Sequence, residues 1–110
     1  WRQSDLGGIN HACEMETSLM LHMQEDIVNK ENIIDNPLTR STYTGVDLLA
    51  GGTVGVSASF KELSDHGVIG SPSLATKEKG ADLFEIITNK ICDFIEDFSK
   101  WKKPLNGKNE

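Results

Sequence analysis

Residues that can move or hold a proton lie together near the start of the chain: His11, Cys13, Glu14 and Glu16. An imidazole titrates near neutral pH and can pass a proton to a leaving nitrogen, which makes His11 a candidate acid–base residue. Glu16 is a candidate for a carboxylate that orients His11 or a ligand. From the residue types alone, His11 could instead brace the start of a helix, and Glu16 could accept backbone N–H groups there.

The element that would position these residues is a short amphipathic helix. Four residues have the i, i+3, i+4, i+7 spacing of one helix face: Cys13, Glu16, Thr17 and Met20. We therefore expect a helix that begins at residue 13 or 14 and ends near residue 23. His11 would lie in the polar loop that leads into it, and Glu14 would be a solvated residue.

A longer amphipathic helix is predicted near the end of the chain. Its apolar residues recur every three or four positions: Phe84, Ile87, Ile91, Phe94, Ile95 and Phe98. We expect Ser73 or Thr76 to cap this helix, which would run to about residue 101, and Pro104 to stop it before a tail at residues 104–110. The apolar stripe would be a core face or an interface.

Between the two helices the sequence is less regular. Residues 33–34 could form a short strand, and residues 53–60 alternate in part and contain β-branched residues, so we expect a strand or an extended segment there. Residues 61–73 contain turn signals and are predicted to form a loop.

Composition limits the possible partners. At 110 residues the chain is one domain at most, and its formal net charge is −6. That charge argues against nucleic acid, which needs clustered Lys and Arg, and against an anionic membrane surface. No apolar run is long enough to span a bilayer. Cys13 and Cys92 indicate free thiols in the cytoplasm rather than a disulfide framework.

The sequence contains no metal-binding motif of its own. His22 and His66 are isolated, and no histidine or cysteine pair has a ligand spacing such as His-x-His or Cys-x-x-Cys. A three-ligand site cannot be assembled from this sequence alone, so we assign no metal or cofactor ligand.

Two blocks of sequence resemble the creatininase (creatinine amidohydrolase) family. Residues 11–21 read His-Ala-Cys-Glu-Met-Glu-Thr-Ser-Leu-Met-Leu and are similar to the family's His-Ala/Gly-Gly-x-x-Glu-Thr-Ser-Leu-Met-Leu segment. Residues 67–80 resemble its Gly-x-x-Gly-Asp-Pro-x-x-Ala-Thr/Ser-x-Glu-Lys-Gly signature, in the same order along the chain. Cys13 and Ser71 depart from these patterns, because the family usually has glycine and aspartate there. The resemblance extends from residue 10 to about residue 98.

This resemblance implies an α/β fold in which residues 1–110 are one partial domain, the C-terminal part of a three-layer α/β/α creatininase-like domain. It implies metal-dependent hydrolysis of a non-peptide or cyclic C–N amide bond in a small molecule. A zinc or manganese ion would lower the pKa of the attacking water, and its ligands would lie mostly outside this chain. His11 would pass a proton to the leaving nitrogen, with Glu16 as a supporting carboxylate.

The resemblance also implies association, either as a homo-oligomer, for which the family suggests a hexamer, or with the remainder of the domain. A different class of function stays open: a non-catalytic fragment or subunit that binds a protein partner through exposed apolar helix faces. The missing metal-ligand segments favour this alternative for the isolated chain.

Overall fold

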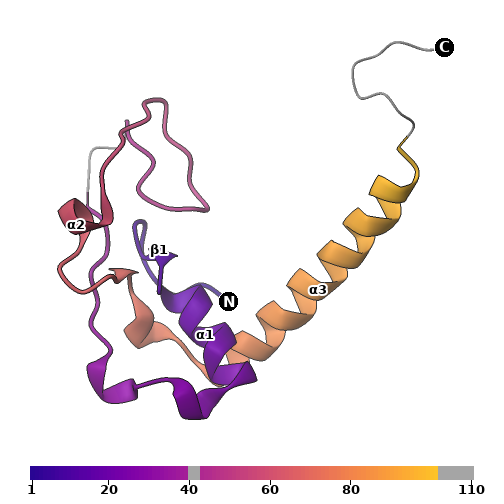
Figure 1. Cartoon of the computed structure of the whole chain (residues 1–110), viewed down its shortest axis with the longest axis horizontal. Helices are drawn as coiled ribbons and strands as arrows, with labels where there is room; N and C mark the ends of the chain where they lie inside the picture. Colours follow the sequence, from indigo (N-terminus) through magenta and orange to yellow (C-terminus); the bar gives the residue numbers. More distant parts are fainter. Residues whose placement is uncertain (40–42, 102–110) are drawn as a thin grey trace.

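The computed structural model describes residues 1–39 and 43–101 (Figure 1). In chain order its elements are β1 (Ile9–His11), α1 (Glu14–Met23), the 3₁₀ turns η1 (Glu25–Ile27) and η2 (Lys30–Asn32), α2 (Phe60–Leu63), β2 (Ile69–Gly70), the 3₁₀ turn η3 (Pro72–Leu74) and α3 (Lys77–Ser99). Helices are combined with a small two-stranded sheet, which is compatible with the expected α/β class. Within the described residues, no helix is both long and apolar enough to cross a bilayer.

The sheet consists of β1 and β2, which pair antiparallel. Ile9 lies opposite Gly70 and His11 opposite Ile69, with an irregularity between the two pairs. Gly70 also exchanges two backbone hydrogen bonds with Asn36, at 2.8 and 2.9 Å. The sheet therefore joins the two sequence blocks. The buried apolar residues form a small core: Ile9, Cys13, Leu21, Val46, Ile69 and Leu83.

α1 and α3 cross where Gly80 meets Ser18. A methyl group on Gly80 would overlap the backbone oxygen of Ser18, so only glycine lets the helices approach this closely. The Ser18 hydroxyl donates to the Glu14 carbonyl oxygen at 2.6 Å and accepts the Thr76 N–H at 3.2 Å. Thr76 caps α3, because its side chain accepts the Lys79 N–H at 3.2 Å. The predicted bounds of both helices are confirmed to within about two residues.

Most of α3 extends away from the rest of the molecule (Figure 1). Only Gly80 and Leu83, near its N-terminal end, are buried. The apolar stripe that was expected to be a core face or an interface is exposed, from 36% for Ile87 to 59% for Ile95. The stripe is therefore not part of the core formed by the described residues.

Of the two expectations for residues 53–60, a strand or an extended segment, the strand is wrong. In the described part of the chain, Val54 makes only an isolated bridge with Thr44, and the last residue of this segment begins α2. The cause is a local capping box, in which the Ser59 N–H donates to the Glu62 carboxylate at 2.7 Å. This arrangement starts a helical turn where the apolar alternation suggested a strand.

Two further expectations for the connecting region are corrected. No strand forms at residues 33–34, and the expected loop over residues 61–73 contains most of α2 and all of β2. His11, expected in a loop, ends β1. β1 and β2 form because they pair with each other across a long stretch of sequence, which a local pattern does not reveal. The predicted tail at residues 104–110 lies outside the described residues.

Candidate active site

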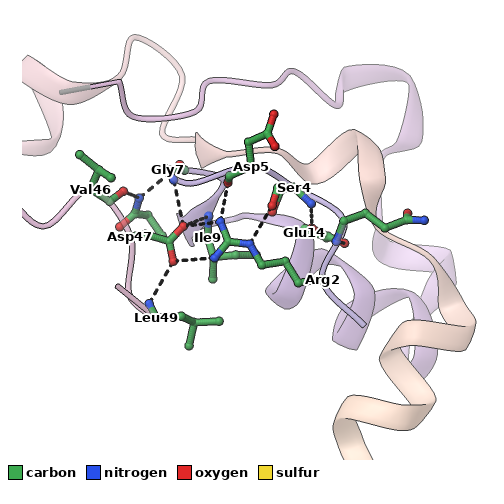
Figure 2. Close-up of polar contacts among 11 residues, drawn as sticks. Arg2, Ser4, Asp5, Gly7, Ile9, Glu14, Val46, Asp47 and Leu49 are labelled. Atoms are coloured by element: carbon green, nitrogen blue, oxygen red, sulfur yellow. Dashed lines mark hydrogen bonds and ion pairs between the residues drawn. The ribbon is translucent and has the colours of Figure 1, made fainter. Parts of the chain in front are cut away.

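Asp47 fixes the segment that leads into β1 (Figure 2). Its buried carboxylate accepts two hydrogen bonds from the Arg2 guanidinium, at 2.8 and 3.2 Å. It also accepts the backbone N–H groups of Gly7, Ile9 and Leu49, at 3.0, 3.2 and 3.0 Å. Burial raises the pKa of the Asp47 carboxyl, but these donors outweigh burial and hold the pKa below its ordinary value. An ionised Asp47 therefore ties the strand that ends at the candidate histidine to a distant part of the chain.

Glu14 is the second buried carboxylate, and the expectation that it is solvated is wrong. Its side chain is fully buried and accepts the backbone N–H groups of Gln3 and Ser4, at 2.9 and 2.8 Å, and the Lys79 ammonium at 2.7 Å. Burial raises the pKa of Glu14, but these donors lower it to about 2. Helix spacing could not reveal this site, because Lys79 belongs to the second sequence block.

His11 lies at the end of β1, directly before a left-handed residue. Ala12 has φ +49°, and this turn connects β1 to the start of α1. The His11 side chain is exposed, and its ring packs edge-on against Phe60, with ring centroids 4.9 Å apart and an interplanar angle of 77°. Within the described residues the ring has this aromatic contact and no hydrogen bond. Its acid–base role stays a prediction.

Glu16 lies in the first turn of α1 and is partly buried. Its Oε2 atom is buried and has no hydrogen-bond partner among the described residues. A buried polar atom without a partner is uncommon in folded proteins, so Glu16 has an unused acceptor. No hydrogen bond joins Glu16 to His11 within that part of the chain, and the predicted orienting role stays a prediction.

The two residues that depart from the creatininase-like pattern have structural positions. Cys13 is fully buried at the N-cap of α1, and a side chain on Gly70, which has φ +148°, would collide with the Cys13 Cβ. Ser71 is buried, and its N–H donates to the Gly8 carbonyl oxygen at 3.0 Å. Burial of the Cys13 thiol is typical of a structural cysteine rather than a nucleophile.

The other histidines have different surroundings. His66 lies in an exposed turn, where its backbone N–H donates to the Ser64 hydroxyl at 3.4 Å. His22 packs against Phe84, with ring centroids 5.6 Å apart. In residues 1–39 and 43–101, no three His, Cys, Asp or Glu side chains could together hold a metal ion. These residues do not fit a metal site of their own. The prediction that ligands lie elsewhere is not tested by this observation.

Comparison with known proteins gives a family match. The model of the family described as Creatininase, creatinine amidohydrolase, matches residues 2–95. No curated protein and no solved structure matches the chain. The matched range includes both sequence blocks, the buried carboxylates and most of α3.

Proposed function

The chain belongs to the creatininase family, and we propose from this premise that it contributes the acid–base residues of an amidohydrolase site. The substrate would be a small molecule with a non-peptide or cyclic C–N amide bond. His11 would protonate the leaving nitrogen as the C–N bond breaks. Glu16 would accept a hydrogen bond from the imidazole or from a substrate N–H group.

One contrast supports this assignment most. Glu14 and Asp47, the carboxylates that hold the fold, are fully engaged by backbone and side-chain donors. Glu16 keeps a buried oxygen without a partner, although it lies on the same short segment as Glu14. Among the carboxylates of the described residues, the buried oxygen without a partner is thus the one at the family's motif position. His11 precedes it, and its ring packs against Phe60.

A divalent ion, zinc or manganese, is expected from family membership. Because the described residues do not fit a metal site, its ligands would come from elsewhere. They would lie in the remainder of a three-layer α/β/α domain or in another copy in a homo-oligomer. The part of the reaction proposed for this chain is the proton transfer and the positioning of substrate.

Hydrolysis by the native assembly tests this function. The chain would be purified with the polypeptide that binds it, and the metal content of the dialysed assembly would be measured. Creatinine would represent cyclic amides and a formylated amine would represent linear ones, with products quantified by mass spectrometry. We expect bound divalent ions and turnover of at least one class. An assembly that binds no divalent ion and hydrolyses neither substrate would contradict the proposal.

A non-catalytic interaction module is the second candidate function. It is favoured by the exposed apolar residues of α3, which include Ile91 at 53% and Phe94 at 56%. In that case Ile91→Lys would abolish partner binding, His11→Ala would leave it unchanged, and the assembly would show no hydrolysis.

A further inference from the structure

The apolar residues of α3 repeat with the spacing of a coiled coil. Intervals of three and four residues alternate along one seam of the helix, Phe84, Ile87, Ile91, Phe94 and Phe98. The same spacing continues to Trp101, two residues beyond the end of α3 at Ser99. Each of these six side chains is between 36% and 56% exposed. We call this set the α3 seam. Its spacing is that of the positions that face a partner helix in a left-handed coiled coil.

The α3 seam is accessible over most of its length. α1 covers α3 only near Gly80 and Leu83, and the ring of His22 contacts Phe84 at the first position of the seam. Beyond that point α3 projects clear of the other described elements (Figure 1). At 1.5 Å per residue the seam is roughly 26 Å long, which is enough for a partner helix of similar length.

The charges beside the seam indicate what that partner is. Lys90 and Asp97 occupy equivalent positions on the same flank, each one residue before a seam residue, and they have opposite charges. The other flank has no charge at its corresponding positions, Thr88 and Ile95. A partner that satisfies the first flank needs an acidic group opposite Lys90 and a basic group opposite Asp97. A second copy of α3 running in the opposite direction provides both.

We propose that the α3 seams of two copies of this chain pack antiparallel around a two-fold axis. Ile91 would lie opposite Phe94 of the second copy, Ile87 opposite its Phe98, and Phe84 opposite its Trp101. Because the interface is self-complementary, each pair occurs twice. The same register places Lys90 beside Asp97 of the second copy, and Thr88 beside its Ile95. A single register thus pairs all six seam residues and places Lys90 and Asp97 side by side.

A parallel pair does not give this match. In parallel coiled coils a flanking residue meets the opposite flank of the partner, so Lys90 would face Ile95 rather than a carboxylate. In a parallel pair, the parts of the two chains that precede α3 would also crowd together at one end. The antiparallel arrangement separates them by the length of the seam.

The present partners of these two residues do not prevent the pairing. Lys90 is 3.9 Å from Asp93, and both side chains are at least 73% exposed, so this contact is weak. Asp97 accepts the Trp101 indole N–H at 2.8 Å through Oδ2, which leaves its other oxygen for a lysine.

Charge reversal at Lys90 and at Asp97 tests both the identity of the partner and the antiparallel direction of the two helices. Sedimentation equilibrium of the full chain at several concentrations should show a monomer–dimer equilibrium. Lys90→Asp and Asp97→Lys should each raise the dissociation constant by about tenfold or more, because each creates two like-charge contacts. An equimolar mixture of the two variants should form a one-to-one heterodimer with the wild-type constant, because the opposite charges face each other again.

Glu85→Lys is the matched control. It changes the net charge as Asp97→Lys does, but Glu85 lies off the seam and its flanks, so dimerisation should be unchanged. Circular dichroism checks that every variant keeps its helix content. A wild-type chain that is monomeric at every concentration would overturn the proposal. So would association that neither exchange weakens, or variants that fail to pair when mixed; the seam would then be covered by something else, such as the remainder of a creatininase-like domain.

Discussion

The Lys79 ammonium donates to the buried Glu14 carboxylate at 2.7 Å, and this ion pair joins the two sequence blocks that identify the family. Glu14 begins α1, directly after the turn that follows His11, whereas Lys79 lies in the first turn of α3. Close by, Gly80 permits the helices to touch at Ser18. Part of the family pattern is therefore explained by the assembly of the fold around the candidate site, rather than by chemistry.

Removal of the Glu14 counter-charge should destabilise the fold. Lys79→Met retains the length of the side chain but removes the charged donor to the buried carboxylate, which keeps the backbone N–H groups of Gln3 and Ser4. Breaking a buried ion pair typically costs about 3–5 kcal/mol, and we expect about 3 kcal/mol because other donors remain. The free energy of unfolding in urea, followed by circular dichroism, measures this loss.

Lys77→Met is the control for that variant. Lys77 pairs with Glu25 at 3.0 Å, but their side chains are 56% and 42% exposed. Exposed ion pairs contribute about 0–1 kcal/mol, so this variant should retain nearly all its stability. Equal losses for Lys77→Met and Lys79→Met would contradict the role given to the buried pair.

The same carboxylate should make stability sensitive to acid. Its pKa is about 2 in the fold against an ordinary value of 4.5, so the unfolded chain takes up this proton first as the pH falls. The stabilisation is complete above about pH 4.5 and disappears as the pH falls through about 2. The difference in unfolding free energy between wild type and Glu14→Gln should therefore shrink over this range.

High salt distinguishes the stabilisation by the buried Glu14 carboxylate from the stabilisation by exposed ion pairs. The pKa of Glu25 is also lowered to about 2, by hydrogen bonds and charge from Lys30 and Lys77. These groups are accessible to solvent, so in about 1 M salt, where the Debye length is about 3 Å, the contribution of Glu25 should fade. The contribution of Glu14 should persist, and its loss in salt would show that the carboxylate is not buried.

Gly80→Ala should lower stability although alanine favours helices by about 1 kcal/mol over glycine. The added methyl would collide with the backbone oxygen of Ser18, which cannot rotate away. Overpacking typically costs about 1–3 kcal/mol, and this severe overlap with backbone should cost about 3 kcal/mol. After subtraction of the gain in helix propensity, we expect a net loss of about 2 kcal/mol in chemical unfolding. Gly55→Ala is the control, because its added Cβ would meet no atom within 4 Å, and it should change stability little.

The turn between His11 and α1 should reject branched side chains. Ala12 has φ +49°, a conformation that costs non-glycine residues about 1–2 kcal/mol and is worse for β-branched ones. Ala12→Val should therefore destabilise by about 2 kcal/mol, whereas Ala12→Gly should be nearly neutral, since relief of strain offsets the added flexibility of the unfolded chain. Thermal unfolding measures both, and equal stability of the two variants would show that Ala12 is not left-handed.

The two long helices could be predicted from the sequence, because spacing and capping are local properties. Thr76 caps α3 as its position suggested, and the periodic residues of α1 lie on a helix of the expected length. The family could also be predicted, since the order of residues in both blocks survives the changes at Cys13 and Ser71.

The surroundings of the candidate site could not be predicted, because they depend on contacts between distant segments. Asp47 bonds to Arg2 and to backbone groups of the first nine residues, and nothing in its local sequence indicates burial. Glu14 looked solvated for the same reason, since its partner Lys79 lies far along the chain. The partial alternation of apolar residues at 53–60 suggested a strand, but the Ser59–Glu62 capping box starts a helical turn at the end of this segment.

Turnover by His11→Ala tests the central claim most directly. In the metal-loaded native assembly, loss of a proton-transferring group should lower kcat by about 10²–10⁴-fold, while the bound metal and the circular dichroism spectrum stay as in wild type. His66→Ala, a change at an exposed turn histidine, should keep full activity. If His11→Ala turns over as fast as wild type and His66→Ala, then His11 does not transfer the proton, and the assignment of the active site to this segment is wrong.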